Sequence, residues 1–526
     1  MRTPRRSRGL LMAALGAATS AILAMAGPAN ATPVAASGHP SPPPQGSVKA
    51  STASGPSAAT SNFEQVKLAS GPDDMGEPMT LAVLPNGDVL HDSRDGTIFY
   101  TTKDGVTSVA AKVPVYNHDE EGLQGIAVDP QFTQDHWVYA YYAPVLNTPS
   151  GDAPDWGTAA DWNRWHGYNQ LSRFKLTSDN TIDLASEQKI MQVGPTDRGI
   201  CCHVAGNIDF DNAGNLYLST GGDTNPFASD GYSPIDDRPG RNPAYDARRS
   251  SANTNDLRGK LLRIHVHPDG SYTEPDGNLF APGTAKTRPE IYAMGFRNPF
   301  RFTVDRKTGI VYLADYGPDA QKPDPNRGPE NTIEYNRITK AGNFGWPLCV
   351  GNNTPYLHYD FATGVSGAPY DCQHPVNDSS LNTGLTDLPP AQPAWIWNHY
   401  AGNPLFPQLG GQGSPMGGPV YHYDPSLKSS TAFPSSYDGQ FFAMEFGQHW
   451  IKPIQMDRNG NIQQINTLTN GQDWAHLVEP MDADFGPDGS LYVLDYGSTW
   501  FSGSADSALY KINYVGPSSA AAHTGG

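Results

Sequence analysis

Residues 482–498 have the sequence DADFGPDGSLYVLDYGS, in which two short runs of alternating apolar residues flank a turn rich in glycine, proline and aspartate. Apolar residues that recur with a period of two predict β-strands, and glycine and aspartate tolerate the backbone angles of a tight reversal. The stretch therefore predicts two antiparallel strands joined by a short turn. The glycine that follows the second strand, Gly497, predicts a loop at that end.

The same strand–turn–strand unit recurs along the chain. Six such units predict an all-β fold, a six-bladed β-propeller. Their irregular spacing predicts long loop insertions at about 224–258, 319–343 and 350–418. A large β-sandwich, or two separate β domains, is the alternative that this spacing leaves open. The other five units lie at 80–102, 125–143, 207–223, 301–318 and 435–462.

The composition agrees with a turn-rich β protein. The 526 residues include 55 glycines, 47 prolines and 25 tyrosines, and only 17% of the residues are charged. The formal net charge of −18 argues against nucleic acid or an anionic membrane surface as a partner, because both require clustered Lys and Arg. An acidic surplus also suits the binding of cations.

The N-terminus has the features of an export signal, which we place at 1–31. It has an arginine-rich start, an apolar run over about 9–26, and small residues before a cleavage point. The pair Arg5 and Arg6 permits export by the twin-arginine route as well as by the general route. No later apolar run approaches the roughly 20 residues that span a bilayer, so we expect no membrane span and a secreted, extracellular protein.

The rest of the chain divides by composition into three parts. Residues 32–62 are rich in Pro, Ser, Ala and Gly and predict a disordered spacer. The propeller is expected over 63–514. Residues 515–526 predict a flexible tail.

An ordered set of motifs resembles the soluble glucose/sorbosone dehydrogenase family over about 63–514. The resemblance implies a six-bladed propeller that oxidises a hydroxyl group of an aldose or related sugar and passes the electrons to an external acceptor. It also implies pyrroloquinoline quinone (PQQ) held through a calcium ion. The motifs are EEGLQGIAVDPQF (120–132), CCHVAGNIDFDNAGNLYLSTGGD (201–223), LRGKLLRI (257–264), PEIYAMGFRNPFRFTVD (289–305), YGPD (316–319), GNFGWP (342–347) and DADFGPDGSLYVLDYG (482–497).

By position, the resemblance implies roles for five residues. His203 falls where the family has its catalytic base, and imidazole is a competent base near neutral pH. Arg297 and Asn298 fall where the family contacts the quinone, and a guanidinium there would stabilise the negative charge that develops during oxidation. The backbone carbonyls of Gly317 and Pro318 fall where the family binds calcium, which prefers oxygen ligands.

Other positions depart from the family pattern. Glu120 stands at a cofactor-binding position where the family has a neutral amide. By an ungapped placement, Gly447, Glu479 and Met481 stand where a lysine and two arginines bind the quinone carboxylates. Each charge-assisted bond lost would cost about 1.5–3 kcal/mol. A second class of function therefore stays open, a propeller that binds carbohydrate or calcium without redox chemistry, with a lactonase-type hydrolase as a third.

The chain has four cysteines, and an even number in an exported protein predicts disulfides. Cys201 and Cys202 could bond to each other while Cys349 bonds to Cys372. Alternatively each of the first two could bridge to one of the second two, or Cys201 and Cys202 could be two free buried thiols. An adjacent bridge beside His203 would present a flat face to a planar cofactor or sugar ring, so we expect Cys201 and Cys202 to contribute to cofactor binding.

Two further segments each permit two interpretations. The acid-rich loop 223–256 suits a structural calcium site or an ordinary solvated loop. The segment AWIWNHYAG (394–402) could present an aromatic surface to a sugar or form the core of a blade.

Overall fold

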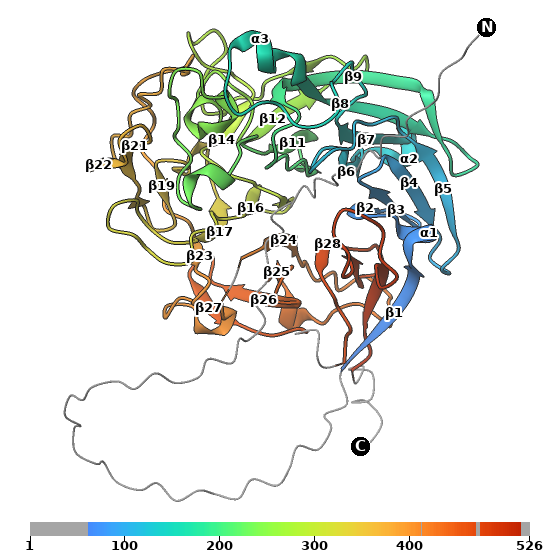
Figure 1. The fold of residues 1–526 in the computed structure, drawn as a ribbon. Coiled ribbons are helices and arrows are strands. Elements are labelled where there is room, and N and C mark those ends of the chain that lie inside the picture. Colours follow the sequence, from blue (N-terminus) through green and yellow to red (C-terminus); the bar gives the residue numbers. More distant parts are fainter. Residues whose placement is uncertain (1–61, 412, 470–473, 517–526) are drawn as a thin grey trace, which may run out of the picture. The chain divides into compact units, whose positions relative to one another are not determined.

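The computed structural model describes residues 62–411, 413–469 and 474–516. Its strands form six main antiparallel sheets around a common axis (Figure 1), which confirms the predicted all-β, six-bladed propeller. The predicted export signal (1–31) lies outside the described residues. So do the predicted spacer, apart from Asn62, and the predicted tail beyond Gly516.

The first three blades follow one another along the chain, and each begins with the strand nearest the axis. Blade 3 is extended by β13 (Tyr272–Thr273), which pairs with β12, and by β18 (Gly342–Asn343), which pairs with β14. Blade 1 is β2 (Pro78–Val83), β3 (Val89–Ser93), β4 (Thr97–Thr101) and β5 (Thr107–Lys112); blade 2 is β6 (Leu123–Val128), β7 (Trp137–Tyr142), β8 (His166–Leu176) and β9 (Ile182–Asp197); blade 3 is β10 (Ile208–Phe210), β11 (Asn215–Thr220), β12 (Lys260–Val266) and β14 (Ile291–Met294).

The last three blades complete the ring, and the innermost strand of each blade packs against that of the next. Blade 4 is β15 (Arg301–Asp305), β16 (Ile310–Asp315), β17 (Ile333–Ile338) and β23 (Ile396–Asn398); blade 5 is β24 (Pro415–Val420), β25 (Phe441–Glu445), β26 (Trp450–Met456) and β27 (Ile462–Ile465); blade 6 is β28 (Pro480–Phe485), β29 (Leu491–Asp495), β30 (Ala508–Tyr514) and β1 (Phe63–Ser70).

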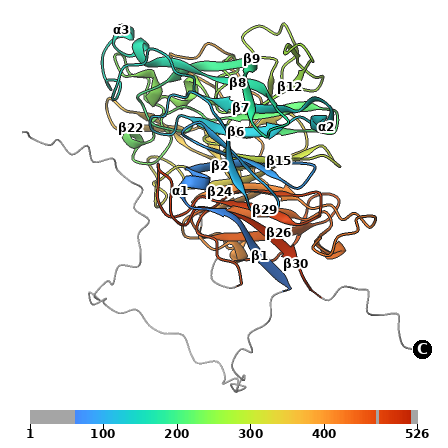
Figure 2. The same cartoon turned by 90° about the vertical axis from the view of Figure 1, so that its right-hand side faces the viewer.

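The ring closes by pairing the first strand with the last. β1 runs antiparallel to β30 with Phe63 opposite Tyr514, and the two strands lie side by side in both views (Figures 1 and 2). Blade 6 therefore combines three strands from the C-terminal part with one from the N-terminal part. This hydrogen-bonded closure leaves no open edge between the first and last blades.

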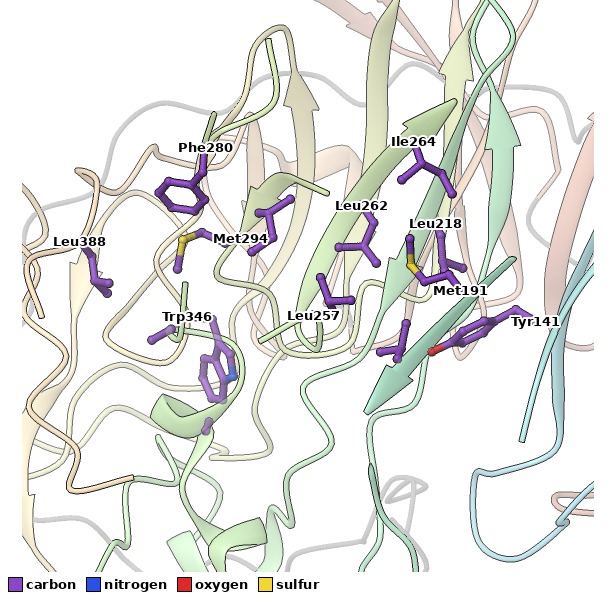
Figure 3. Close-up of a cluster of buried hydrophobic side chains, with 14 of the residues drawn as sticks. Tyr141, Met191, Leu218, Leu257, Leu262, Ile264, Phe280, Met294, Trp346 and Leu388 are labelled. Atoms are coloured by element: carbon purple, nitrogen blue, oxygen red, sulfur yellow. The ribbon is translucent and has the colours of Figure 1, made fainter. Parts of the chain in front are cut away.

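The core lies between the faces of neighbouring blades. Because each blade is covered on both faces, its middle strands are apolar at consecutive positions, and all six residues of β7 (WVYAYY) are buried. Figure 3 shows the cluster between blades 2 and 3, where Tyr141 and Met191 face Leu218 and Leu262. This packing fixes the blades to one another and so fixes the loops that extend from their ends.

Two of the predicted insertions contain blade strands, which corrects their boundaries. β17 lies inside 319–343, β23 lies inside 350–418, and β24 begins at Pro415 within that same segment. β23 has only three residues and lies in a proline-rich stretch, so its sequence has too few alternating positions to predict a strand. The intervening loop carries two small hairpins, β19 (Cys349–Val350) with β20 (Thr354–Pro355), and β21 (Leu357–Asp360) with β22 (Val365–Pro369).

The α-helices of the described residues are single turns in loops, α1 (Pro72–Met75), α2 (Phe132–Asp135) and α3 (Ala159–Trp162). Within the described part of the chain, none of the helices has the length and apolar character needed to cross a bilayer.

Candidate active site

The predicted site residues gather at one end of the propeller, which we call the mouth. It consists of the loops that precede the innermost strands and those that follow the second strands. These loops meet because the first two strands of a blade are antiparallel, so the start of one lies beside the end of the other. The predicted residues in these loops are Glu120, Cys201, Cys202, His203, Arg297, Asn298, Gly317 and Pro318.

Glu120 holds the backbone of His203. Its Oε2 accepts hydrogen bonds from the backbone N–H of His203 (2.7 Å) and of Val204 (3.3 Å). His203 has a left-handed conformation with φ of 73°, which is uncommon for a residue other than glycine. A Cβ at Gly221 would lie 1.9 Å from the His203 carbonyl oxygen, so only glycine fits behind this turn. The structure thus gives Glu120 a positioning contact that the sequence did not indicate.

The imidazole of His203 is buried, and its surroundings favour the neutral form. Burial, and then the charge of Arg297, lower the pKa of His203 well below its usual value, while a hydrogen bond with the Thr224 backbone opposes the shift. Only 5% of the residue is exposed. A neutral imidazole has a free ring nitrogen that can accept a proton from a ligand in the mouth.

Arg297 and Asn298 are fixed by one carboxylate. Asp315 accepts hydrogen bonds from the backbone N–H of Arg297 (2.9 Å) and of Asn298 (2.7 Å). The Arg297 guanidinium lies 3.4 Å from Asp319 Oδ2 and 5.3 Å from the centre of the Tyr316 ring. The side-chain oxygen of Asn298 is buried without a hydrogen-bond partner. A buried cation and an unpaired acceptor therefore stand next to each other.

The two disulfides match the first of the three alternatives that the sequence left open. Cys201 bonds to Cys202, and Cys349 bonds to Cys372. The sulfurs of Cys201 and Cys202 and a carboxylate oxygen of Glu120 lie within 4.8 Å of one another. The adjacent bridge is therefore part of the mouth, whereas the second bridge secures the hairpins of the blade 4 loop.

The predicted calcium segment is rich in oxygen donors. Pro318 O accepts a hydrogen bond from Asn331 Nδ2. Asp319 Oδ1 and Asn331 Oδ1 are buried and have no hydrogen-bond partner. Unpaired carboxylate and amide oxygens beside backbone carbonyls form a donor set of the kind that calcium prefers.

The blade 5 and blade 6 side of the mouth has a different charge. Burial, and then the neighbouring Asp495, Asp506 and Glu445, raise the pKa of Glu479 to about 8. Glu479 is 8% exposed, and its Oε2 has no hydrogen-bond partner. Met481 packs in the apolar core. The nearby Lys452 donates to the carbonyl of Gln408. These residues do not fit a cluster of cofactor carboxylates.

A repeated carboxylate that the sequence analysis missed builds the mouth. Asp315, Glu445 and Asp495 each end the second strand of a blade and accept backbone N–H groups from the entry to an innermost strand. Burial raises their pKa values to about 7, 7 and 6 in that order, although the backbone hydrogen bonds oppose the shift. The signal was present as a repeat of Asp or Glu, an aromatic residue and Gly, at 315–317, 445–447 and 495–497.

The acid-rich loop 223–256 is held by arginines. Arg258 pairs with Asp223 (2.7 Å) and Asp256 (2.6 Å). Arg249 pairs with Asp197 (2.5 Å). Further along the loop Asp236 pairs with Arg238, and Asp246 with Arg248. These carboxylates are engaged in ion pairs, so neither a calcium site nor a solvated loop describes them.

The segment AWIWNHYAG divides between core and surface. Trp395 packs against the ring of Tyr312 and donates to the carbonyl of Gly460, as a core residue would. Trp397 and His399 line an open cleft together with residues of the loop between β16 and β17. At the opposite end of the innermost strands from the mouth, a cavity of about 430 Å3 lies among residues that include Asp209, Asp482 and Asp484, and none of the predicted site residues lines it.

Comparisons with known proteins identify the family and several relatives of this chain. A family model described as Glucose / Sorbosone dehydrogenase matches residues 75–376. The aldose sugar dehydrogenase YliI of Escherichia coli is 26% identical over 297 residues, which cover 56% of this chain and 63% of that enzyme. An uncharacterized protein of Synechocystis sp. is 24% identical over 446 residues, which cover 82% of this chain and 84% of that protein.

Solved structures show the same fold. The PQQ-bound form of an aldose sugar dehydrogenase from Streptomyces coelicolor has a TM-score of 0.52 and 19% identity, and the match covers 87% of this chain and 99% of that one. The soluble aldose sugar dehydrogenase of Escherichia coli in its apo form has a TM-score of 0.54 and 18% identity, over 86% of this chain and 99% of that one.

Proposed function

Because this chain belongs to the glucose/sorbosone dehydrogenase family, we propose that it is an exported oxidoreductase that oxidises a hydroxyl group of an aldose or related sugar in the mouth. The observation that carries the proposal is the buried His203, whose pKa is lowered by burial and by the neighbouring cation Arg297. The family match covers the loops that hold both residues. The bonding of all four cysteines supports an extracellular location, because disulfides persist in oxidising compartments.

In this proposal His203 is the general base. A sugar hydroxyl bound against its free ring nitrogen gives up its proton to the imidazole as the C–H bond breaks, which is the proton transfer that a neutral histidine can perform. Glu120 keeps the ring in place through the His203 backbone. Arg297, fixed by Asp315, would stabilise negative charge that develops on an oxygen beside it.

The donor set fits one end of a PQQ molecule and a calcium ion. Arg297 and Asn298 would hold the quinone end, and the Cys201–Cys202 bridge would lie against the ring. Gly317 and Pro318 carbonyls, with Asp319 and Asn331, would hold calcium. When bound, the quinone would supply the acceptor for two electrons, and an external acceptor would then reoxidise it.

The residues expected to bind the carboxylates at the other end of PQQ do not match that group. Gly447 and Met481 carry no charge, and the Glu479 carboxyl is surrounded by other carboxylates. This observation favours a second candidate function, a propeller that binds a neutral carbohydrate or calcium without redox chemistry. The two candidates differ in whether PQQ binds.

Titration of the purified protein with PQQ and calcium separates the two candidates. The proposed oxidoreductase is expected to give a new absorbance band on binding and to reduce a dye when an aldose is added. Arg297→Met should weaken PQQ binding, and Asn331→Ala should weaken calcium binding in the same titration. Absence of PQQ binding at micromolar concentration, together with retained sugar or calcium binding, would instead support the second candidate.

A further inference from the structure

Two large aromatic side chains stand half-exposed at the rim of the mouth. Trp500 is 51% exposed and Phe501 is 52% exposed. Both lie in the loop between β29 and β30, which follows the second strand of blade 6 and therefore lies at the mouth. Adjacent exposed rings leave apolar area in water, and such area on a soluble protein often marks a binding site.

These rings are held in place rather than free to turn. The Trp500 ring contacts Phe446 edge-on with centroids 5.3 Å apart, and it lies 6.0 Å from the Tyr496 ring. Phe501 has a left-handed backbone with φ of 57°, and its N–H donates to the Tyr496 hydroxyl (3.0 Å). A bulky residue keeps that conformation only when its surroundings enforce it. The surface is thus pre-organised for a ligand.

A short series of contacts links this surface to His203. The Arg94 guanidinium lies 5.0 Å from the centre of the Phe501 ring. Its Nη1 donates to the backbone carbonyls of Asp119 (2.6 Å) and Glu121 (2.9 Å). Those residues flank Glu120, which holds the His203 backbone. The aromatic pair is therefore connected through Arg94 to the loop that positions the proposed base.

From this arrangement we propose that Trp500 and Phe501 form a subsite for a second sugar unit, so that the preferred ligand is a neutral oligosaccharide. This inference rests on the proposed function and names its substrate class. The C–H face of a pyranose stacks on an aromatic ring, and carboxyl groups exchange hydrogen bonds with its hydroxyls.

The charges around the subsite select against anionic sugars. The ionisable groups that face this loop from the packed elements are Glu77, Glu479, Asp495 and Asp506, with Arg94 as a cation. Arg94 already pairs with Glu77 (2.8 Å). A uronate chain would meet the exposed carboxylate of Asp506, which repels it, and no unpaired cation from Arg94, whereas a neutral chain meets no such repulsion.

The test is a calorimetric titration of the full chain with glucose, maltotetraose, cellotetraose and a tetragalacturonate. For the wild-type protein we expect at least one neutral tetrasaccharide to bind more tightly than glucose. Trp500→Ala should reduce the ratio of the tetrasaccharide affinity to the glucose affinity roughly 10-fold, and Phe501→Ala should reduce it by a smaller factor. Thermal melting of each variant confirms that it is folded.

Trp156→Ala is the matched control, because Trp156 is 50% exposed in the loop between β7 and β8, where its ring lies against the guanidinium groups of Arg238 and Arg241. It should leave the affinity ratio unchanged. Equal ratios in Trp500→Ala and wild-type protein, the same loss in Trp156→Ala, no preference for a tetrasaccharide, or tighter binding of the tetragalacturonate would each overturn the proposal. Because the readout is binding, a protein that binds tetrasaccharides as expected but oxidises no sugar would refute the proposed function and leave the subsite standing.

Discussion

On the blade 3 side of the mouth, buried carboxylates are paired with arginines, whereas on the blade 5 and blade 6 side Glu445 and Asp495 accept backbone N–H groups. Asp223 and Asp256 share Arg258 on the first side. On the second side, burial raises the pKa of Glu445 to about 7 and that of Asp495 to about 6. Both arrangements satisfy the hydrogen-bonding capacity of a buried carboxylate, but only the first compensates its charge.

The difference separates two tasks. Burial opposes the ionisation of Asp197, but Arg249, His166 and Arg258 outweigh burial and lower its pKa. Burial and Asp197 raise the pKa of Asp223, although Arg258 and Arg249 oppose the shift. The ion pairs of these arginines connect the loop beside His203 to Asp197. Glu445 and Asp495 instead hold the backbone at the entries to β24 and β28 through hydrogen bonds from N–H groups.

The largest effect is expected at the proposed base. His203→Ala should lower sugar oxidation by ~10²–10⁴-fold, because the hydroxyl proton loses its acceptor. Steady-state turnover with an aldose and a dye measures the effect. His374→Ala serves as the control, since its side chain is 85% exposed and pairs with Asp371 away from the mouth. Unchanged turnover in the first variant would remove His203 from the mechanism.

The stability of the blade 3 side of the mouth, where carboxylates pair with arginines, should be sensitive to the loss of one arginine. Arg258→Met leaves Asp223 and Asp256 without their shared cation, and it should lower the free energy of unfolding by about 3–5 kcal/mol. Chemical denaturation measures the change. Arg306→Met is the comparison, because Arg306 is 58% exposed and pairs with Asp209 at 3.5 Å, so a change below about 1 kcal/mol is expected. Equal effects of the two substitutions would contradict the comparison between the two sides.

The two disulfides should differ in the same experiment. Removing Cys349–Cys372, which closes a loop with a sequence separation of 23, should cost roughly 3 kcal/mol of stability on the loop-entropy estimate. Cys201→Ser with Cys202→Ser should cost less than about 1 kcal/mol, because a bridge between neighbours restricts little of the unfolded chain. That second variant should instead weaken ligand binding in the mouth. A large loss of stability with unchanged binding would show a structural bridge.

The smallest effect concerns Glu479, on the blade 5 and blade 6 side of the mouth, and it depends on pH. Because the native pKa of Glu479 is raised from 4.5 to about 8, the folded protein retains a proton that the unfolded chain releases between those pH values. The free energy of unfolding therefore falls as pH rises through this window. Glu479→Gln should remove roughly 1–3 kcal/mol of that fall between pH 5 and pH 9.

Denaturation of the wild-type protein and of Glu479→Gln at pH 5, 7 and 9 measures this difference. The same substitution at the exposed Glu64 controls for the change from carboxyl to amide. If wild type and Glu479→Gln show parallel pH dependence, the carboxyl group is ionised in the folded protein, and the contrast between the two sides of the mouth fails.

The sequence by itself determined the fold. Each strand–turn–strand unit is local, so its alternation and turn residues can be recognised without knowing what packs on it. Six local units then leave few ways to bury their faces other than a ring of blades. The blade strand β23 was missed because three residues carry too little periodicity, and it forms a strand because β17 supplies its hydrogen bonds.

Only the tertiary structure decided how the mouth is built. Glu120 and His203 are 83 positions apart, and their hydrogen bond exists because the loops of blades 2 and 3 converge. The pairing of Cys201 with Cys202, one of the three alternatives that the sequence left open, likewise required the folded loops. Whether a carboxyl group is paired or unpaired depends on neighbours brought together across blades. Burial and long-range charge set its pKa, and neither is a property of the local sequence.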